Sequence, residues 1–421
     1  MIVLPAVLIL LAVAAAAVVA FGTHPDWMVF RHGLGIIMAA HRLQWPLTFL
    51  AMLLCVALLA LVVSGKRRAV WVLGLAPVIG LLAYHFRSGP MRGFAVADNP
   101  PLVSAGKGAG FLGEDDYVVG LQWGESAYAF PYALLYANPV VLHVERGRRL
   151  LLMWSPFANH ATAYQVDRNL RGPELAIVSM PANALLLYNG RLGQFINGLT
   201  GQTPAGKRPT GFYQPVPTVK TTWKHWRGAH PQTRVLALPP RYTGLPRRPV
   251  LPYFPTPGAD PAEAGARVTV VNAGPNGIAV PAEKVTTLPL NLTPDAGAPV
   301  VLFRDPQAGF ARAFDRRFDP EVAPEFRPAS NPPGAGGAAL LDGVTGSGWT
   351  LSGRAVSGDA RLRGMRLSPV PVDEDLPLEV VRYWYPQVTL LDVGPEDYAR
   401  AMDPAPPVRP AAPERQRTRR R

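Results

Sequence analysis

The stretch LLLMWSPFANHATAYQVDR, residues 150–168, carries the pattern that decides the fold. Five apolar residues in a row predict a buried strand, and the Ser-Pro pair that follows them predicts a turn. The residues after the turn favour a second strand. Ser155, Ala158 and Asn159 occupy this turn, and the rest of the sequence has to explain why.

The composition indicates a β-rich soluble region with a substantial core. The chain has 421 residues, of which 48% are hydrophobic and 17% charged, enough for one large or two ordinary domains. The 46 Pro and 40 Gly residues favour many turns and short elements. The single cysteine, Cys55, lies in an apolar run, so the soluble region has no thiol for disulfides, catalysis or zinc binding.

The net charge of +13 comes mainly from arginine, with 36 Arg against 6 Lys. This bias accompanies abundant Ala, Pro and Gly and does not predict a nucleic-acid partner. Residues 394–421 include the Pro- and Arg-rich sequence DPAPPVRPAAPERQRTRRR, which we predict to be a disordered basic tail. A contact of this tail with nucleic acid or anionic lipid is the alternative.

Three apolar runs predict a membrane anchor of three transmembrane helices over residues 1–86. Residues 1–21 carry no charge and can span a bilayer core at about 1.5 Å per residue. Runs that begin at Pro46 and Ala69 have aromatic residues near their ends, as spanning helices do. A cleaved signal peptide is the alternative for the first run, but no basic segment precedes it.

The basic loop Lys66–Arg68 predicts the orientation of this anchor. The loop between the second and third runs is short, and the positive-inside rule assigns it to the cytoplasm. Residues 22–45 and everything after Phe86 then lie outside. We therefore expect an integral membrane protein whose soluble region is extracytoplasmic, on the periplasmic side if the source is bacterial.

An internal repeat predicts that the soluble region consists of two similar units. Adding 150 to a residue number brings Pro131 onto Pro281 and Pro156 onto Pro306, among other matches. The register then slips by a few residues, as expected where loops differ in length. The predicted organisation is the anchor at 1–86, a connector at 87–111, a first repeat at 112–238, a Pro-rich linker at 239–265, a second repeat at 266–393 and the tail at 394–421.

The first unit resembles DUF 3179, a bacterial and archaeal domain-of-unknown-function family, and the second unit resembles it more weakly. The resemblance runs from FLGEDDYVVGLQWGESAYAFPYALL, from residue 111, through the opening stretch to VPTVKTTWKHWRGAHPQTRVL, which ends at residue 236 and is the most specific part. The family has no established activity, so the resemblance implies a scaffold and no reaction.

This chain departs from the family at a candidate site. Family members typically have Tyr-Cys-Pro-Leu-Cys-Gly where this chain has residues 154–159, WSPFAN, and Trp-His-Glu where it has residues 136–138, YAN. Thiol, imidazole and carboxylate chemistry is thereby removed from these positions. The candidate degenerate site consists of Ser155, Ala158, Asn159, His160 and Asn138. We expect no metal at this turn or at its second-repeat counterpart, where Asp305, Gln307 and Phe310 stand.

The remaining polar candidates are weak. Ser155 lies in no G-x-S-x-G motif, and His160 has no acid or second histidine nearby in sequence, which favours a structural imidazole. Four of the eight histidines fall on the predicted outer side and could bind copper or zinc, although their spacings match no ligand motif. They are His24, His32, His41 and His85.

The sequence therefore predicts a three-helix membrane anchor followed by a mainly β (β-rich α+β) soluble region made of two similar repeats. We interpret it as a non-catalytic binding or structural module without a cofactor. Its expected partners are the lipid bilayer and a protein or small-molecule ligand of unknown identity. Two alternatives stay open: a divergent enzyme or redox protein that uses the first repeat, and metal handling through the outer-side histidines.

Overall fold

The computed structural model describes residues 3–64, 68–89, 91–239, 244–272, 277–294, 297–319, 321–329, 337–394 and 397. The chain divides into two compact units, Met1–Arg267 with Asp375–Pro386, and Val268–Glu374 with Gln387–Arg421. Lys66 and Arg67 of the predicted cytoplasmic loop, and almost all of the predicted tail, lie outside the described residues.

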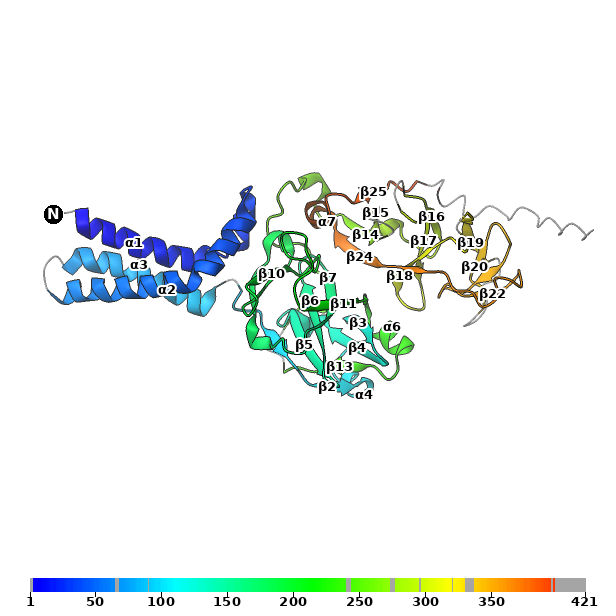
Figure 1. The fold of residues 1–421 in the computed structure, drawn as a ribbon, viewed down its shortest axis with the longest axis horizontal. Coiled ribbons are helices and arrows are strands. Elements are labelled where there is room, and N and C mark those ends of the chain that lie inside the picture. The colour runs from blue at the N-terminus through cyan, green and yellow to red at the C-terminus, as the bar shows by residue number, and fades with distance from the viewer. Residues whose placement is uncertain are drawn as a thin grey trace, which may run out of the picture. The chain divides into compact units, whose positions relative to one another are not determined.

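Three helices form the N-terminal region: α1 (Val3–Phe21), α2 (Gly33–Val63) and α3 (Arg68–Ser88), with a short 3-10 turn, η1 (Pro25–Val29), after α1. They are the blue ribbons of Figure 1 and pack on one another through a core rich in alanine. Both α2 and α3 are long and apolar enough to cross a membrane, whereas the apolar helix found at α1, Ala6–Phe21, is shorter. The helical N-terminal region is thus confirmed.

The helix α2 begins earlier than the apolar run that predicted it. We expected a helix from Pro46, but it starts at Gly33 and continues through that proline. No helix breaker lies between Gly35 and Pro46, and a proline inside a long apolar helix is tolerated. The extension adds about three turns, which carry His41 and Gln44.

The first unit is built around a central sheet that contains the opening stretch. The sheet has the order β1-β5-β6-β7-β11 and is antiparallel except for the parallel pair β1 and β5. The predicted buried strand and the strand after the turn are β6 and β7. The bounds are β1 Val96–Asp98, β5 Val140–Glu145, β6 Arg148–Ser155, β7 His160–Val166 and β11 Phe212–Val216.

Two further sheets pack on the two faces of this central sheet. One has the order β12-β3-β4-β13-β2 and the other β10-β9-β8. The bounds are β2 Leu102–Ser104, β3 Tyr117–Trp123, β4 Ser126–Pro131, β8 Leu175–Ser179, β9 Leu186–Asn189, β10 Gln194–Asn197, β12 Thr218–Thr222 and β13 Arg234–Leu236. β1 and β2 lie in the predicted connector, as does the short helix α4 (Ala105–Gly108).

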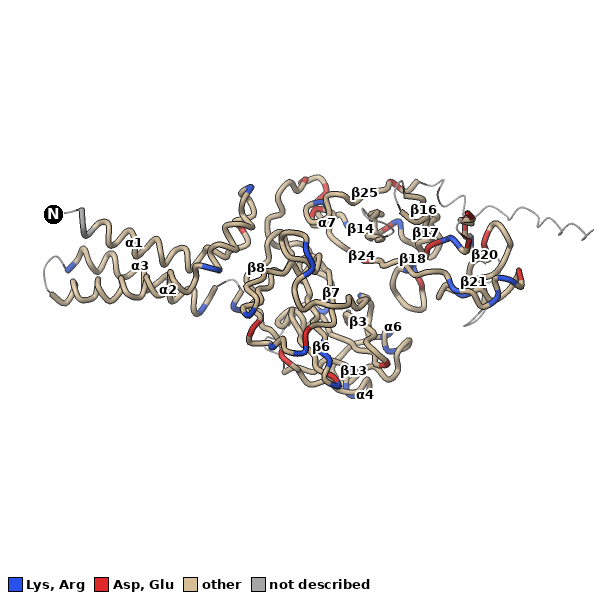
Figure 2. The backbone as a smooth tube through the Cα atoms, in the orientation of Figure 1, with Lys and Arg blue, Asp and Glu red and all other residues tan. Residues whose placement is uncertain are grey.

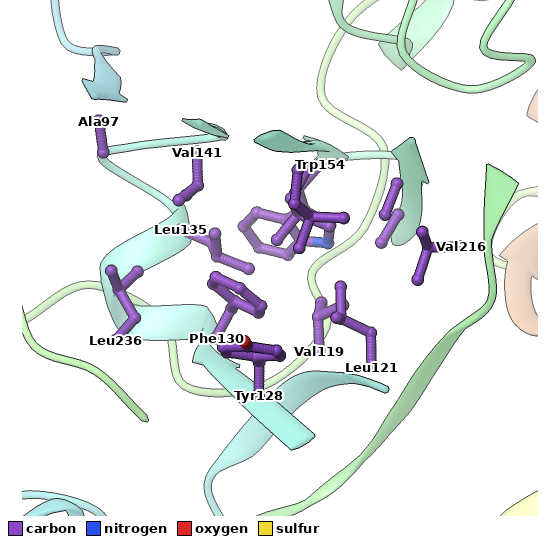
Figure 3. Close-up of a cluster of buried hydrophobic side chains, with 14 of the residues drawn as sticks. Ala97, Val119, Leu121, Tyr128, Phe130, Leu135, Val141, Trp154, Val216 and Leu236 are labelled. Atoms are coloured by element: carbon purple, nitrogen blue, oxygen red, sulfur yellow. The ribbon is translucent and has the colours of Figure 1, made fainter. Parts of the chain in front are cut away.

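The three-layer arrangement explains the apolar run in β6. Leu152 and Trp154 point to the core shared with the β3–β4 hairpin, where they pack with residues such as Phe130 (Figure 3). Leu151 and Met153 point to the opposite face and pack in a second core with β8 and β9. Because successive side chains of a strand alternate between its faces, a strand buried on both faces has to be apolar throughout.

Two short helices follow strands of the sheet β12-β3-β4-β13-β2: α5 (Tyr132–Leu135) after β4 and α6 (Trp223–Ala229) after β12. Trp223 and Trp226 of α6 are buried, as their shared helical face predicts. The ring of Trp226 lies on β3 at Gly120, where a Cβ would come within 2.4 Å of it. A side chain at Gly120 would therefore displace α6.

The second unit has its own three sheets, of orders β24-β14-β15-β25, β16-β17-β18-β23 and β19-β20-β21-β22. Val300 and Leu302 of β17 face one core, and Val301 and Phe303 face another. The bounds are β14 Arg267–Val271, β15 Ile278–Pro281, β16 Leu290–Leu292, β17 Val300–Asp305, β18 Phe310–Asp315, β19 Phe326–Pro328, β20 Leu340–Asp342, β21 Gly348–Trp349, β22 Ala355–Ser357, β23 Pro369–Val370, β24 Val372–Pro377 and β25 Thr389–Leu390. The mainly β soluble region is confirmed.

Candidate functional site

The candidate site lies at the turn between β6 and β7. Ser155 and His160 face each other as the last ladder pair, and the amide of Ala158 donates to the carbonyl of Ser155 at 3.2 Å. Asn159 has a φ of 49°, in the left-handed region that asparagine tolerates better than most residues. Position 159 therefore has a backbone conformation that suits glycine or asparagine.

The hydroxyl of Ser155 is hydrogen-bonded to the backbone of a neighbouring loop. Its Oγ accepts a hydrogen bond from the amide of Leu185 at 3.0 Å, and the residue is fully buried. Ala158 is also buried, in a cluster with Leu199 and with Val380 of the helix α7 (Leu378–Trp384). Ser155 thus supplies the hydrogen-bond acceptor for the backbone N–H of Leu185 in that loop.

Asn159 links three segments of the first unit. Its Oδ1 accepts from the hydroxyl of Tyr132 at 2.8 Å, and its Nδ2 donates to the Asp375 carboxylate at 2.9 Å and to the Asp375 carbonyl at 3.0 Å. Tyr132 in turn packs against Trp154, with ring centroids 4.7 Å apart. The carboxamide, buried apart from 1% of its surface, holds the turn to α5 and to the segment that leads into α7.

His160 lies beside the buried amine of Lys220. Burial, and to a lesser extent the Lys220 charge, lower the pKa of His160 to about 3. Lys220 Nζ donates to the carbonyl of Asn159. The imidazole is therefore neutral at physiological pH, and the nearest cation contributes to holding it neutral.

Asn138 is a ladder neighbour of this turn. The amide of Trp154 donates to the carbonyl of Pro139 at 2.7 Å, which continues the β5–β6 register and places Asn138 opposite Ser155. The Asn138 carboxamide donates to the carbonyl of Leu134 at 3.0 Å and caps α5. The structure thus places Asn138 and His160 on either side of Ser155 in the sheet, and the side chains of Asn138 and Ser155 are hydrogen-bonded to backbone groups.

The corresponding turn of the second unit is stabilised by a carboxylate. Asp305 Oδ1 accepts from the amides of Gln307 at 2.9 Å and Ala308 at 3.1 Å. Its Oδ2 accepts from Arg312 Nε at 2.8 Å. Phe310 is the ladder partner of Asp305, in the place that His160 has beside Ser155. Asp305 therefore organises its own loop.

The four histidines that the sequence predicts on the outer side lie in different surroundings. His24 contacts Asp26 at 3.3 Å, and His32 immediately precedes α2. His41 packs edge-on against Tyr188, with ring centroids 4.7 Å apart. His85 lies 2.9 Å from the Gln44 carboxamide, measured between the two Nε2 atoms, and lines the same cavity as His41. Within the described part of the chain, no group of three or more His, Cys, Asp or Glu is placed to hold a metal ion.

Sequence reasoning missed Lys220, Tyr132 and Asp375, which complete the site. Lys220 had a detectable signal, since it is one of only six lysines and interrupts a run of Val and Thr before a tryptophan. Asp375 had none, because it lies 216 residues from Asn159. Chemically, the site offers a hydroxyl, a neutral imidazole and an amine, all buried and close to one turn.

Comparison with known proteins identifies the family and gives no further relatives. No curated protein and no solved structure matches the chain. The sequence model of the family described as "Protein of unknown function (DUF3179)" matches residues 93–384, which is more than half of the chain and includes the turn, Lys220 and Asp375. The chain therefore belongs to the DUF3179 family.

Proposed function

We propose that this protein is a membrane-anchored, extracytoplasmic binding or structural module. The turn between β6 and β7 is not used for catalysis. The observation that carries the proposal is the way the polar side chains of the turn are engaged. Ser155 binds a backbone amide, and Asn159 bridges Tyr132 and Asp375, with both side chains buried. Groups held in buried hydrogen bonds stabilise a fold and are not presented to a substrate.

The N-terminal helices support the anchor. Large apolar side chains of α2 and α3, such as Phe49, Val56 and Leu73, are exposed, which a helix bundle in water avoids. Figure 2 shows the three helices almost free of charged residues along their length. We propose that all three cross the bilayer, that the Lys66–Arg68 loop is cytoplasmic and that the bilayer is the principal partner.

The strand orders support two copies of one unit. The strand order β12-β3-β4-β13 in the first unit corresponds to β24-β14-β15-β25 in the second. In the same way, β5-β6-β7-β11 corresponds to β16-β17-β18-β23. The registers agree as well, since Leu152 pairs with Ala163 and Leu302 with Ala313. We propose that the soluble region arose by duplication, with a first repeat near 112–238 and a second near 266–393 joined by the Pro-rich linker.

Cysteine labelling tests the anchor and its orientation. With Cys55→Ala as the background, a cysteine at exposed Ala259 in the linker should react with a membrane-impermeant thiol reagent in intact cells. A cysteine at exposed Arg68 should react only after the membrane is opened. The reverse pattern would invert the orientation, and release of the protein by alkaline carbonate would reject the anchor.

Metal analysis tests the non-catalytic reading of the turn. We expect the purified full chain to contain no stoichiometric transition metal and His160→Ala to leave its metal content unchanged. A metal present at one equivalent and lost in His160→Ala would reject the proposal and support an enzyme. Asn138→Ala is the matched control, because it alters a neighbouring polar residue without removing an imidazole.

A further inference from the structure

A cavity of about 680 Å³ lies in the first unit between the ends of the three N-terminal helices and the strands β1 and β8. Its volume is within the roughly 300–1,000 Å³ that is usual for small-molecule sites. Thr23 of the segment after α1, Gln44 of α2 and His85 of α3 line the helical side. A hydrogen bond joins the helical side to the β side: the hydroxyl of Ser179, at the end of β8, donates to the Thr23 carbonyl at 2.7 Å.

The cavity contains one positive and one negative side chain. Arg92 follows α3, is exposed and lines the cavity. Its Nε donates to the carbonyl of His85 at 3.3 Å, and its Cζ lies 5.9 Å from the centre of the Phe86 ring. Asp98 at the end of β1 accepts from the amide of Gly172 at 3.2 Å. A Cβ at Gly172 would lie 2.4 Å from that of Asp98, so the glycine makes room for the carboxylate.

Further hydrogen-bonding groups line the cavity. The Gln44 carboxamide contacts the His85 ring, with the two Nε2 atoms 2.9 Å apart. His41 is held by edge contact with Tyr188 and also lines the cavity. A ligand that carries both an anionic and a cationic group, together with ester or hydroxyl oxygens, would find a partner for each of them here.

An apolar track leads away from the cavity. Trp45 lines the cavity and is 76% exposed, and Phe49, Met52 and Val56 are also exposed. Positions 45, 49, 52 and 56 follow the i, i+4, i+7, i+11 spacing of one helical face. The track therefore runs along α2 from the cavity into the apolar segment that begins at Pro46, and an exposed tryptophan at the start of such a segment is typical of the membrane interface.

From this arrangement we propose that the cavity binds the head group of a zwitterionic phospholipid that carries a primary ammonium, taken from the outer leaflet. The phosphate faces Arg92, the primary ammonium faces Asp98, and an acyl chain follows the track from Trp45 to Val56. This inference rests on the proposed membrane anchor. It names the lipid class that the cavity takes, which the anchor alone does not determine.

Native mass spectrometry of the full chain in a mild non-ionic detergent tests the proposal. Phosphatidylethanolamine, phosphatidylcholine and phosphatidylglycerol with identical acyl chains are offered separately. We expect one phosphatidylethanolamine per chain, bound about ten-fold more tightly than either other lipid, because choline has no N–H donor for Asp98 and glycerol has no positive charge. Equal binding of the three lipids would mean a non-specific lipid shell and would overturn the proposal.

Variants at the two charges assign their roles. Arg92→Gln should weaken phosphatidylethanolamine binding about ten-fold, and Asp98→Asn should abolish the preference over phosphatidylglycerol while keeping an acceptor for the Gly172 amide. Arg87→Gln is the matched control, an exposed arginine of α3 that does not line the cavity, and should bind as the wild type does. If Arg92→Gln does not fold, Arg92→Lys should keep most of the binding, and loss of binding in a folded Arg92→Lys would count against a charge contact.

Further experiments distinguish a lipid from a soluble ligand, and failure of this inference from failure of the proposed anchor. Displacement of the lipid by millimolar inorganic phosphate or phosphoethanolamine would indicate a soluble ligand and overturn the lipid assignment. A chain that dimerises through α2 in place of binding lipid would overturn it too. Carbonate extraction is scored independently: a protein that stays in the membrane without selective lipid binding refutes this inference alone, whereas an extracted protein refutes the anchor.

Discussion

Replacing Asn159 by alanine should destabilise the first unit more than any other single substitution in the turn between β6 and β7. The substitution removes the acceptor of the buried Tyr132 hydroxyl and both donors to Asp375. A buried polar group left without its partner costs about 1–3 kcal/mol, and a non-glycine residue without a polar side chain at positive φ costs about 1 kcal/mol more. The expected loss is therefore about 2–4 kcal/mol of unfolding free energy.

A series of variants separates these contributions. Asn159→Gly relieves the backbone at φ 49° but loses the same hydrogen bonds, so it should be about 1 kcal/mol more stable than Asn159→Ala. Asn159→Asp keeps the Tyr132 acceptor but places a second carboxylate beside Asp375, so its stability should improve on acidification. Arg146→Ala is the matched control, since Arg146 has the same φ of 49° in an exposed hairpin and should change stability by less than about 0.5 kcal/mol.

The assay is thermal unfolding of the full chain in detergent, followed by tryptophan fluorescence. For a unit of this size about 1 kcal/mol shifts the midpoint by roughly 2–4 °C, so Asn159→Ala should melt at least about 4 °C below the wild type. If Asn159→Ala and Arg146→Ala unfold within 1 °C of the wild type, the hydrogen bonds of Asn159 do not stabilise the unit and the structural reading of the turn is wrong.

Three further changes test the same structure. Ser155→Ala should lower the unfolding free energy by about 1–3 kcal/mol in chemical denaturation, because the buried Leu185 amide loses its acceptor; a loss below 0.5 kcal/mol would contradict this. Gly120→Ala should lower the thermal midpoint, because the new Cβ would lie 2.4 Å from the Trp226 ring, whereas Gly106→Ala meets open space and should not. The pKa of His160 is about 3 in the folded state, below its ordinary 6.5, so the unfolded state binds more protons between these values and stability should fall as the pH drops from about 6.5. His160→Phe, which copies the second unit, should remove about 2 kcal/mol of the loss between pH 7 and pH 5 in a pH series of unfolding curves, and an unchanged slope would exclude this role for His160.

Much of the fold could be predicted because its signals are local. The apolar run 150–154 predicts a buried strand, and the Ser-Pro pair predicts the turn. The run does not tell which sheets cover the two faces of β6, because Leu152 and Leu151 are chemically identical although they pack in different cores. Similarly, the hydropathy pattern gave the apolar run of α2 from Pro46 but missed the turns before it, which include His41, Arg42 and Gln44 and pack on the β region.

The candidate site could be predicted only in part. The comparison of WSPFAN with the family motif located Ser155, Ala158 and Asn159, and structure places them together with His160 and Asn138. What Asn159 does depends on Tyr132, 27 residues away, and on Asp375, 216 residues away. Neither distance follows from a periodicity, so no reading of the motif alone could assign these partners.

The sequence by itself determined the class of each segment: apolar N-terminal helices, a mainly β soluble region, a turn at Pro156 and membership of a family. Each of these follows from composition, periodicity or short motifs, which act over a few residues. The tertiary structure decided that the side chains of the turn are buried and engaged with backbone and remote residues. It also decided that Arg92 and Asp98 line one cavity with Trp45. Burial and hydrogen-bond partners depend on which distant segments pack together, and that choice is made by the free energy of the whole unit.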